Sequence, residues 1–284
     1  SGAFNWQQGS RLQWVDKDSF VYNDVSESGS HYVARRVSVS GKEELATYEM
    51  PIQDGWRDQY FISLNYRRLS ALRPDYGYFS IPPLDNSEIE NLRDDGLWYV
   101  DYDSGEDTLL YSLDQMCQVK PAANFEGSLH YANHVMISPS GDRFVFLHRY
   151  LSDGIRFDRL MLGTPDGDPL QVLADHQMVS HYCWIDNDTI IGYMRGPDGK
   201  DGYHILNVDG GTMESALGGQ LDRYGDGHPH VNGSTMVTDT YPNKGRMQTL
   251  LRCDLESQSV EEIAEVHHGL RYDAQTRCDL HPRL

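Results

Sequence analysis

Residues 133–150 read NHVMISPSGDRFVFLHRY, and this stretch decides the fold. A Ser-Pro-Ser-Gly-Asp turn separates two runs, and ring-bearing side chains alternate with aliphatic and basic ones along the second run. This pattern predicts a β-hairpin. Because the second strand of a hairpin returns to the edge where the first one began, His134 and His148 are expected at the same edge.

The hairpin recurs along the chain, in residues 181–195 and again in residues 228–241. A histidine opens each unit, and the openings are spaced by 47 (181 − 134), 47 (228 − 181) and 53 (281 − 228) residues. The opening residues are His134, His181, His228 and His281, with Arg11 at the equivalent position of the first unit. A period in the forties with several short strands in each unit is typical of β-propeller blades.

We therefore predict an all-β fold, a β-propeller of four-stranded antiparallel blades, of which five to six are visible in this chain. The predicted blades cover about 11–57, 58–127, 128–178, 179–224 and 225–276, and a sixth unit starts at 277. Because a closed propeller leaves no exposed sheet edge, we expect residues 1–284 to form a single propeller domain that lacks part of the first blade and most of the last.

The ends of the inner strands are the predicted functional region. In a propeller each innermost strand begins at one face around the central channel, so the opening residues are expected in a ring there. Residues 65–78 leave the hairpin pattern and are rich in arginine and tyrosine. An insertion of this kind predicts a binding loop.

Charge and composition exclude some classes of function. The 43 acidic and 24 basic residues give a formal charge of −19, which argues against nucleic acid as a partner. An anionic ligand is still expected, because several arginines lie at predicted rim positions. No apolar run approaches the roughly 18 residues of a membrane span, and the start has no signal-peptide pattern. The four cysteines form no CxxC pair, so neither a zinc ribbon nor a thioredoxin motif is indicated, and the cellular compartment stays open.

Motifs along nearly the whole chain resemble bacterial WD40-like propellers related to oligogalacturonate lyase and, more loosely, the propeller ulvan lyases. The similar segments are 5–14, 63–69, 72–78, 133–139, 146–149, 178–184, 226–229, 238–242 and 277–283. The resemblance implies seven blades in the complete protein and cleavage of uronate-containing polysaccharides by β-elimination. It also implies a divalent metal (Mn, Ca or Zn) held in a Gln-x-x-His-x-His pattern. Here the His-x-His is His228 and His230, with His281 as a third candidate ligand, and Gly225 stands where the glutamine would be.

Elimination across C4 and C5 of a uronate needs a cation for the carboxylate, a base for the C5 proton and an acid for the leaving oxygen. Arginine matches a carboxylate with two parallel hydrogen bonds, and histidine titrates near neutral pH. The candidate bases are His134 and His181, and the candidate acids are Tyr182 and His148. Arg195, with Arg149 or Arg67, is expected on the carboxylate. The further substrate-binding candidates are Arg11, Arg68, Asp239, Arg246, Arg277 and Asp279.

Other interpretations stay open. Propeller repeats also place histidines at this connection for structural hydrogen bonding, and loop arginines are often only solvated. A non-catalytic propeller that binds a glycan or a protein in bacterial polysaccharide metabolism is the alternative to a lyase. A hydrolase with Asp239 and Asp279 as paired carboxylates is a third possibility, although no spacing argument brings the two to the separation that this mechanism requires. The expected partner is an acidic oligo- or polysaccharide.

Overall fold

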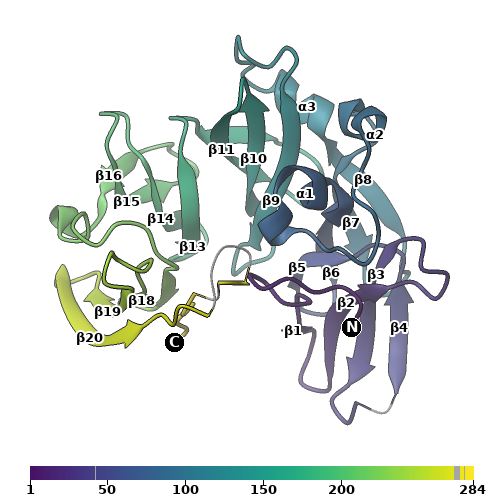
Figure 1. The fold of residues 1–284 in the computed structure, drawn as a ribbon, viewed down its shortest axis with the longest axis horizontal. Helices are drawn as coiled ribbons and strands as arrows, with labels where there is room; N and C mark the ends of the chain where they lie inside the picture. The colour runs from purple at the N-terminus through teal and green to yellow at the C-terminus, as the bar shows by residue number, and fades with distance from the viewer. Residues whose placement is uncertain (42, 272–275, 278) are drawn as a thin grey trace. The chain divides into compact units, whose positions relative to one another are not determined.

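A computed structural model describes residues 1–41, 43–271, 276–277 and 279–284. In this part of the chain, the strands form five sheets of four strands each, and the strands of every sheet follow one another in chain order (Figure 1). The described strand pairings are antiparallel. Four of the sheets fall within predicted blades, whereas the second begins with β5 Ile52–Trp56, inside the predicted first blade. The boundary predicted at about 57 is therefore too late, while the predicted all-β fold of four-stranded antiparallel blades is confirmed.

The strands of the first two sheets are β1 Gln13–Trp14, β2 Ser19–Val25, β3 Tyr32–Ser38, β4 Glu44–Tyr48, β5 Ile52–Trp56, β6 Tyr60–Leu64, β7 Gly96–Asp101 and β8 Asp107–Ser112. Those of the third sheet are β9 Leu129–Ile137, β10 Phe144–Ser152, β11 Ile155–Gly163 and β12 Gln171–Ala174. Those of the last two are β13 Val179–Trp184, β14 Thr189–Arg195, β15 Asp201–Asn207, β16 Met213–Ser215, β17 His230–Asn232, β18 Thr235–Thr238, β19 Met247–Asp254 and β20 Ser259–His267.

The helices are short and lie between strands. They are α1 Tyr66–Leu72, η1 Pro74–Tyr76, α2 Asn86–Glu90, α3 Leu113–Gln118 and η2 Ala216–Gly219. None of the described helices could cross a bilayer.

The chain divides into two compact units. Unit 1 comprises residues 1–137, 141–157 and 161–172, and unit 2 comprises residues 138–140, 158–160 and 173–284. The expectation of a single propeller domain stays a prediction. In unit 1 an aromatic-rich core packs between the sheets, and the rings of Tyr66 and Tyr78 stack at 4.2 Å within it.

The segment predicted as a binding loop contains the short helices α1 and η1. The Asn65 side chain caps α1 by accepting the backbone N–H groups of Arg67 and Arg68. Arg68 is only 2 % exposed and forms an ion pair with Asp95. Its guanidinium also donates to the backbone carbonyls of Glu88, Ile89, Asn91 and His130. The buried arginine therefore ties α1 to α2 and β9.

Two inner strands contain β-bulges at the predicted functional positions. On β9 a two-residue bulge that includes His134 lies opposite Phe146 of β10. On β13 a second bulge, which includes His181, lies opposite Tyr193 of β14. A bulge changes the direction of a side chain at the end of a strand and often lies next to a functional site.

Left-handed backbone recurs at the same repeat position. Arg11, His134 and His281 have φ values of +54°, +58° and +45°. This conformation is uncommon for residues other than glycine and costs roughly 1–3 kcal/mol for each residue. Three equivalent residues in separate repeats thus share a strained conformation, which sets the direction of each side chain.

Candidate functional site

Three of the four repeated histidines converge in unit 2. The rings of His181 and His228 have centroids 4.2 Å apart, and those of His228 and His281 are 3.8 Å apart. His181 and His228 are 7 % and 6 % exposed, and His281 is half-buried. His134 belongs to unit 1, where its ring packs edge-on against Tyr76 at 5.7 Å. We call His181, His228 and His281 the histidine cluster.

A buried carboxylate orients two members of the cluster. Oδ1 of Asp239 accepts the backbone N–H of His228 at 2.7 Å and its Nδ1–H at 2.8 Å. Oδ2 of Asp239 accepts the backbone N–H groups of Leu280 and His281 at 3.0 and 3.1 Å. Asp239 therefore joins the segment before β17 to the C-terminal residues and fixes where both rings lie.

The protonation of Asp239 determines the tautomer of His228. Burial acts to raise the pKa of Asp239, but the hydrogen bonds and positive charge that His228 supplies outweigh it, and the pKa lies below its ordinary value. An ionised carboxylate only accepts hydrogen bonds, so Nδ1 of His228 carries the proton and Nε2 carries the lone pair. With Nδ1–H held by Asp239, Nε2 is the ring nitrogen that faces away from the carboxylate and is placed to exchange a proton.

A glycine permits this close approach. A Cβ atom on Gly227 would lie 1.8 Å from the backbone oxygen of Asp239. Any side chain at this position would push the segment that carries His228 away from the carboxylate. The sequence Asp226-Gly227-His228 is thus a local requirement of the site.

A second carboxylate orients the neighbouring ring. Nδ1 of His181 lies 3.2 Å from Oδ1 of Asp226, and the hydroxyl of Ser180 donates to Oδ2 of Asp226 at 2.6 Å. The Ser180 hydroxyl also lies 3.1 Å from Nδ1 of His181. Two Asp–His pairs therefore stand side by side, one on the β13 bulge and one before β17.

His281 differs from its neighbours. Burial, reinforced by the adjacent His228 ring, lowers the pKa of His281 to about 4. The ring is therefore neutral at neutral pH. Its Nδ1 contacts the backbone oxygen of Asp279 at 3.3 Å, so that nitrogen carries the proton. His281 is consequently a weak base.

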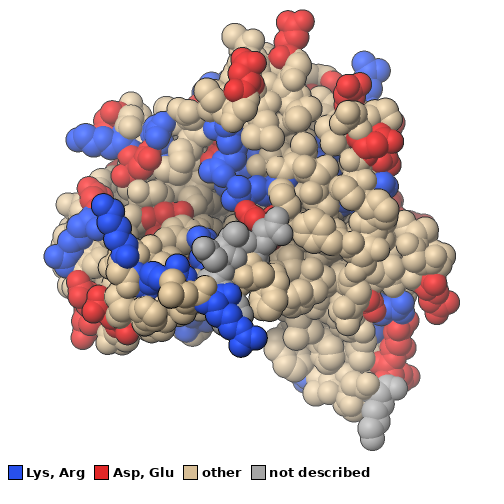
Figure 2. Space-filling view, viewed as in Figure 1, with Lys and Arg blue, Asp and Glu red and all other residues tan. Residues whose placement is uncertain are grey.

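An arginine and a tyrosine border the cluster. The Tyr241 ring lies 6.2 Å from that of His181 and 5.7 Å from that of His228. The guanidinium of Arg277 stacks on Tyr241 at 4.5 Å and forms an ion pair with Asp279 at 3.0 Å. Figure 2 shows several basic side chains near the C-terminal end, labelled C in Figure 1. Arg277 is itself partly exposed. Cation, aromatic ring and imidazoles thus adjoin one another.

The other predicted catalytic residues and carboxylate-binding arginines are buried or already paired. Tyr182 is 2 % exposed in β13 and pairs with Gly192 of β14. His148 is fully buried in unit 1, where it contacts His130. Arg195 forms an exposed two-pronged ion pair with Asp201, at 2.7 and 3.2 Å. Arg149 is 4 % exposed in β10.

The remaining predicted binding arginines, like Arg277, have protein partners. Arg11 donates to the backbone oxygen of Gln53, Arg67 forms a two-pronged ion pair with Glu88, and Arg246 donates to the backbone oxygen of His268. Buried Arg68 pairs with Asp95 and ties α1 to α2 and β9. For the hydrolase interpretation, Asp239 and Asp279 are both buried and hydrogen-bonded, which leaves neither as an accessible acid.

The metal pattern that the resemblance implies does not assemble here. Nδ1 of His230 accepts the backbone N–H of Leu284 at 3.2 Å, and burial together with the charge of Arg283 lowers the pKa of His230. Among the described residues, the only three histidine, cysteine or acidic side chains whose ligand atoms lie within 4.8 Å of one another are Cys117, His130 and His148. His228, His230 and His281 are not such a group, and we derive no chemical step through a metal at this position.

Sequence reasoning missed three members of the site: Ser180, Asp226 and Tyr241. The spacing of the sequence could have indicated two of them, Asp226 and Tyr241. Asp226 precedes His228 by two residues and Tyr241 follows Asp239 by two, and residues two apart on an extended chain point to the same face.

No family model and no curated protein matches the chain. It is similar to solved structures instead. An oligogalacturonate lyase from Vibrio parahaemolyticus is 14% identical, with a TM-score of 0.54, over 93% of this chain and 66% of that one. A prolyl endopeptidase is 10% identical, with a TM-score of 0.56, over 89% of this chain and 34% of that one.

A third similar structure, named as a dipeptidyl aminopeptidase IV from Bacteroides ovatus, is 10% identical with a TM-score of 0.51, over 90% of this chain and 40% of that one. The chain thus spans just under two thirds of the lyase and less than half of each peptidase. At such identities the likeness concerns the fold alone, because one fold hosts many functions. The chain has the fold of a β-propeller, as its repeats predict.

Proposed function

We propose that this chain is a lyase-like propeller that cleaves a uronate-containing acidic glycan by β-elimination. The observation that carries the proposal is the pair of Asp–His units, His228–Asp239 and His181–Asp226, with rings 4.2 Å apart beside Arg277 and Tyr241. A base, an acid and a cation of the kinds that elimination needs are then within one side-chain cluster.

In the proposed step the enzyme takes one proton from the sugar and gives one proton to the leaving oxygen. Nε2 of His228 takes the C5 proton, and the electron pair left behind forms the C4–C5 double bond while the bond from C4 to the leaving oxygen breaks. Protonated His181, held by Asp226, returns a proton to that oxygen. Arg277 neutralises the uronate carboxylate, which makes the C5 proton more acidic, and Tyr241 offers a face for the sugar ring.

The test is incubation of the folded chain with a panel of uronate polymers and oligomers, followed by ultraviolet absorbance of the unsaturated product. We expect product from at least one acidic glycan and none from neutral polysaccharides. A flat absorbance trace across the whole panel, from protein with an intact melting transition, would contradict the proposal.

A non-catalytic glycan-binding propeller is the second candidate, and one observation favours it. His228 and His181 are 6 % and 7 % exposed, which limits how closely a C5 proton could approach. This candidate predicts measurable affinity for an acidic glycan without product. Calorimetric titration beside the absorbance assay separates the two candidates.

A further inference from the structure

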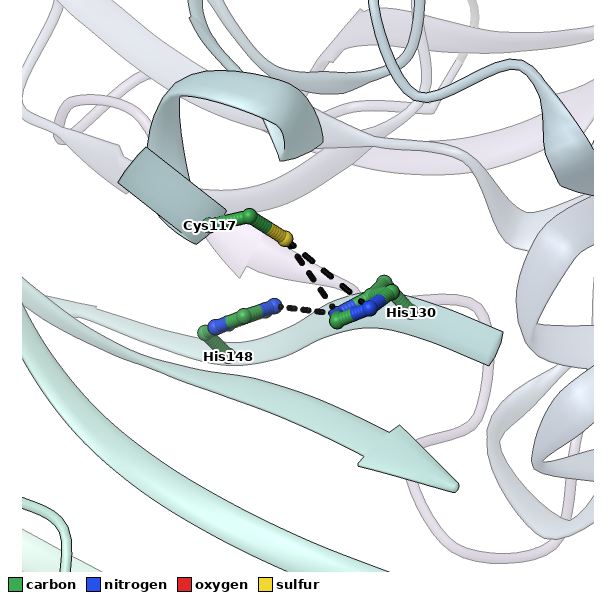
Figure 3. Close-up of side chains that lie close together, drawn as sticks. All are labelled: Cys117, His130 and His148. Atoms are coloured by element: carbon green, nitrogen blue, oxygen red, sulfur yellow. Dashed lines mark hydrogen bonds between the residues drawn. The ribbon is translucent and has the colours of Figure 1, made fainter. Parts of the chain in front are cut away.

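Three side chains from separate segments of unit 1 meet in its interior, away from the histidine cluster. Cys117 comes from α3, His130 from β9 and His148 from β10 (Figure 3). Their ligand atoms all lie within 4.8 Å of one another. We propose that Cys117, His130 and His148 form a binding site for a zinc ion.

The local structure holds each ligand in place. A capping box, in which Ser112 and Gln115 bond each other's backbone, fixes the start of α3. His148 and His130 lie on the same face of neighbouring strands, because Tyr150 pairs with His130 and His148 is two residues before Tyr150. The three ligands therefore come from regular elements, which favours a preformed site.

The distances suit tetrahedral zinc. Sγ of Cys117 lies 3.4 Å from Nδ1 of His130, and Nδ1 of His130 lies 3.0 Å from Nε2 of His148. Zinc–ligand bonds of about 2.0–2.1 Å to nitrogen and about 2.3 Å to sulfur place two nitrogens about 3.3 Å apart and a sulfur and a nitrogen about 3.6 Å apart. Sγ of Cys117 also lies 3.9 Å from Nε2 of His130, and all three ligand atoms are within 4.8 Å of one another. A rotation of the Cys117 side chain away from the His130 ring would therefore bring the three atoms around one ion.

The contacts of His130 also support a cation site. Its Nδ1 contacts both Cys117 and His148, although a neutral ring nitrogen has either one proton or one lone pair. A cation between the three atoms would let every lone pair point at the same centre.

The donor types select the metal class. A thiolate with two imidazoles suits zinc, whereas calcium and manganese favour oxygen ligands. The fourth position would be filled by water or by another group, as in zinc sites with three protein ligands. Binding also requires Cys117 to lose its proton.

Aromatic side chains enclose the site. Phe125 packs edge-on against His130 at 5.2 Å and against His148 at 6.0 Å, and Tyr150 stacks on His130 at 5.5 Å. His130 and His148 are 1 % and 0 % exposed, while Cys117 is partly exposed. An ion would therefore enter from the side of Cys117 and be held in a dry pocket.

The test uses the full chain, treated with a chelator and then titrated with Zn²⁺, or with Co²⁺ as a spectroscopic probe. We expect one Zn²⁺ per chain, a near-ultraviolet thiolate-to-Co²⁺ absorption band, and a higher melting temperature with Zn²⁺. Cys117→Ser is the main variant because it changes one atom in a partly exposed residue. It should lose the band and weaken Zn²⁺ binding at least tenfold.

Cys253→Ser is the matched control, since Cys253 is a buried free cysteine of unit 2. It should keep the band and the affinity for Zn²⁺. A band that persists in Cys117→Ser, or folded wild-type chain that retains no Zn²⁺ after titration, would overturn the proposal. Cleavage of a glycan plays no part in either readout.

Discussion

Replacing His228 with alanine is expected to lower the rate of glycan elimination by about 10²–10⁴-fold, the usual contribution of a general base. Asp239 accepts Nδ1–H of His228 at 2.8 Å, and its pKa lies below the ordinary value, so Nε2 is the nitrogen left to take the C5 proton. Alanine removes that nitrogen. Initial rates of unsaturated product, measured on the substrate identified by the panel, give the ratio to wild type.

The control is His176→Ala, because His176 is exposed and belongs to the same unit. This variant should match wild type in rate and melting temperature. Melting curves of His228→Ala are needed as well, since Asp239 loses one of its partners there. A His228→Ala chain that is folded and as fast as wild type would remove His228 from the mechanism.

Replacing Arg68 with alanine should lower the free energy of unfolding by about 3–5 kcal/mol, the usual cost of removing one partner of a buried ion pair. The Arg68 and Asp95 side chains are 2 % and 9 % exposed, and Arg68 also bonds four backbone carbonyls. Urea unfolding of both proteins at pH 7 measures the difference.

The pH dependence adds a second criterion for Arg68. Burial raises the pKa of Asp95 even with the arginine present. Without Arg68 the carboxyl would take up a proton more readily, so the loss of stability should shrink as the pH falls.

Arg67→Ala is the matched control for Arg68→Ala. Arg67 is the preceding residue, and its ion pair with Glu88 is 31% and 41% exposed. Such pairs contribute about 0–1 kcal/mol. Equal losses of stability in the two variants would contradict the structural role of Arg68.

The architecture was predictable because it repeats. A spacing of 47 residues between His134, His181 and His228 predicts equivalent hairpins, and the last three sheets repeat with a similar period, because β9, β13 and β17 begin at residues 129, 179 and 230. The second sheet takes a longer segment, since α1, η1 and α2 lie between its strands β6 and β7. The same repetition identifies His181, His228 and His281 as candidate site residues. Their three rings lie together in unit 2.

The hydrogen-bond partners of the histidines were less predictable, because the sequence pattern implies that side chains alternate regularly between the two faces of each strand. The bulges at His134 and His181 break that alternation and change where each ring points. Asp226 lies 45 residues from its partner His181, and Asp239 lies 11 residues from its partner His228. No local sequence pattern predicts pairs at these separations.

The group of Cys117, His130 and His148 could not be predicted from the sequence either. Cys117 and His130 are separated by 13 residues, and His130 and His148 by 18, which matches no common metal motif. The hairpin pattern alone places His148 on the returning strand opposite His134 and so predicts a catalytic role for it. Only the packing of α3 beside β9 and β10 brings the three side chains together.

The most direct test of the central claim is a crystal structure of the chain with an acidic oligosaccharide bound. We predict that a uronate carboxylate contacts Arg277, that the sugar ring lies against Tyr241, and that C4 and C5 face His181 and His228. An oligosaccharide bound elsewhere, with the histidine cluster unoccupied and unchanged, would contradict this account.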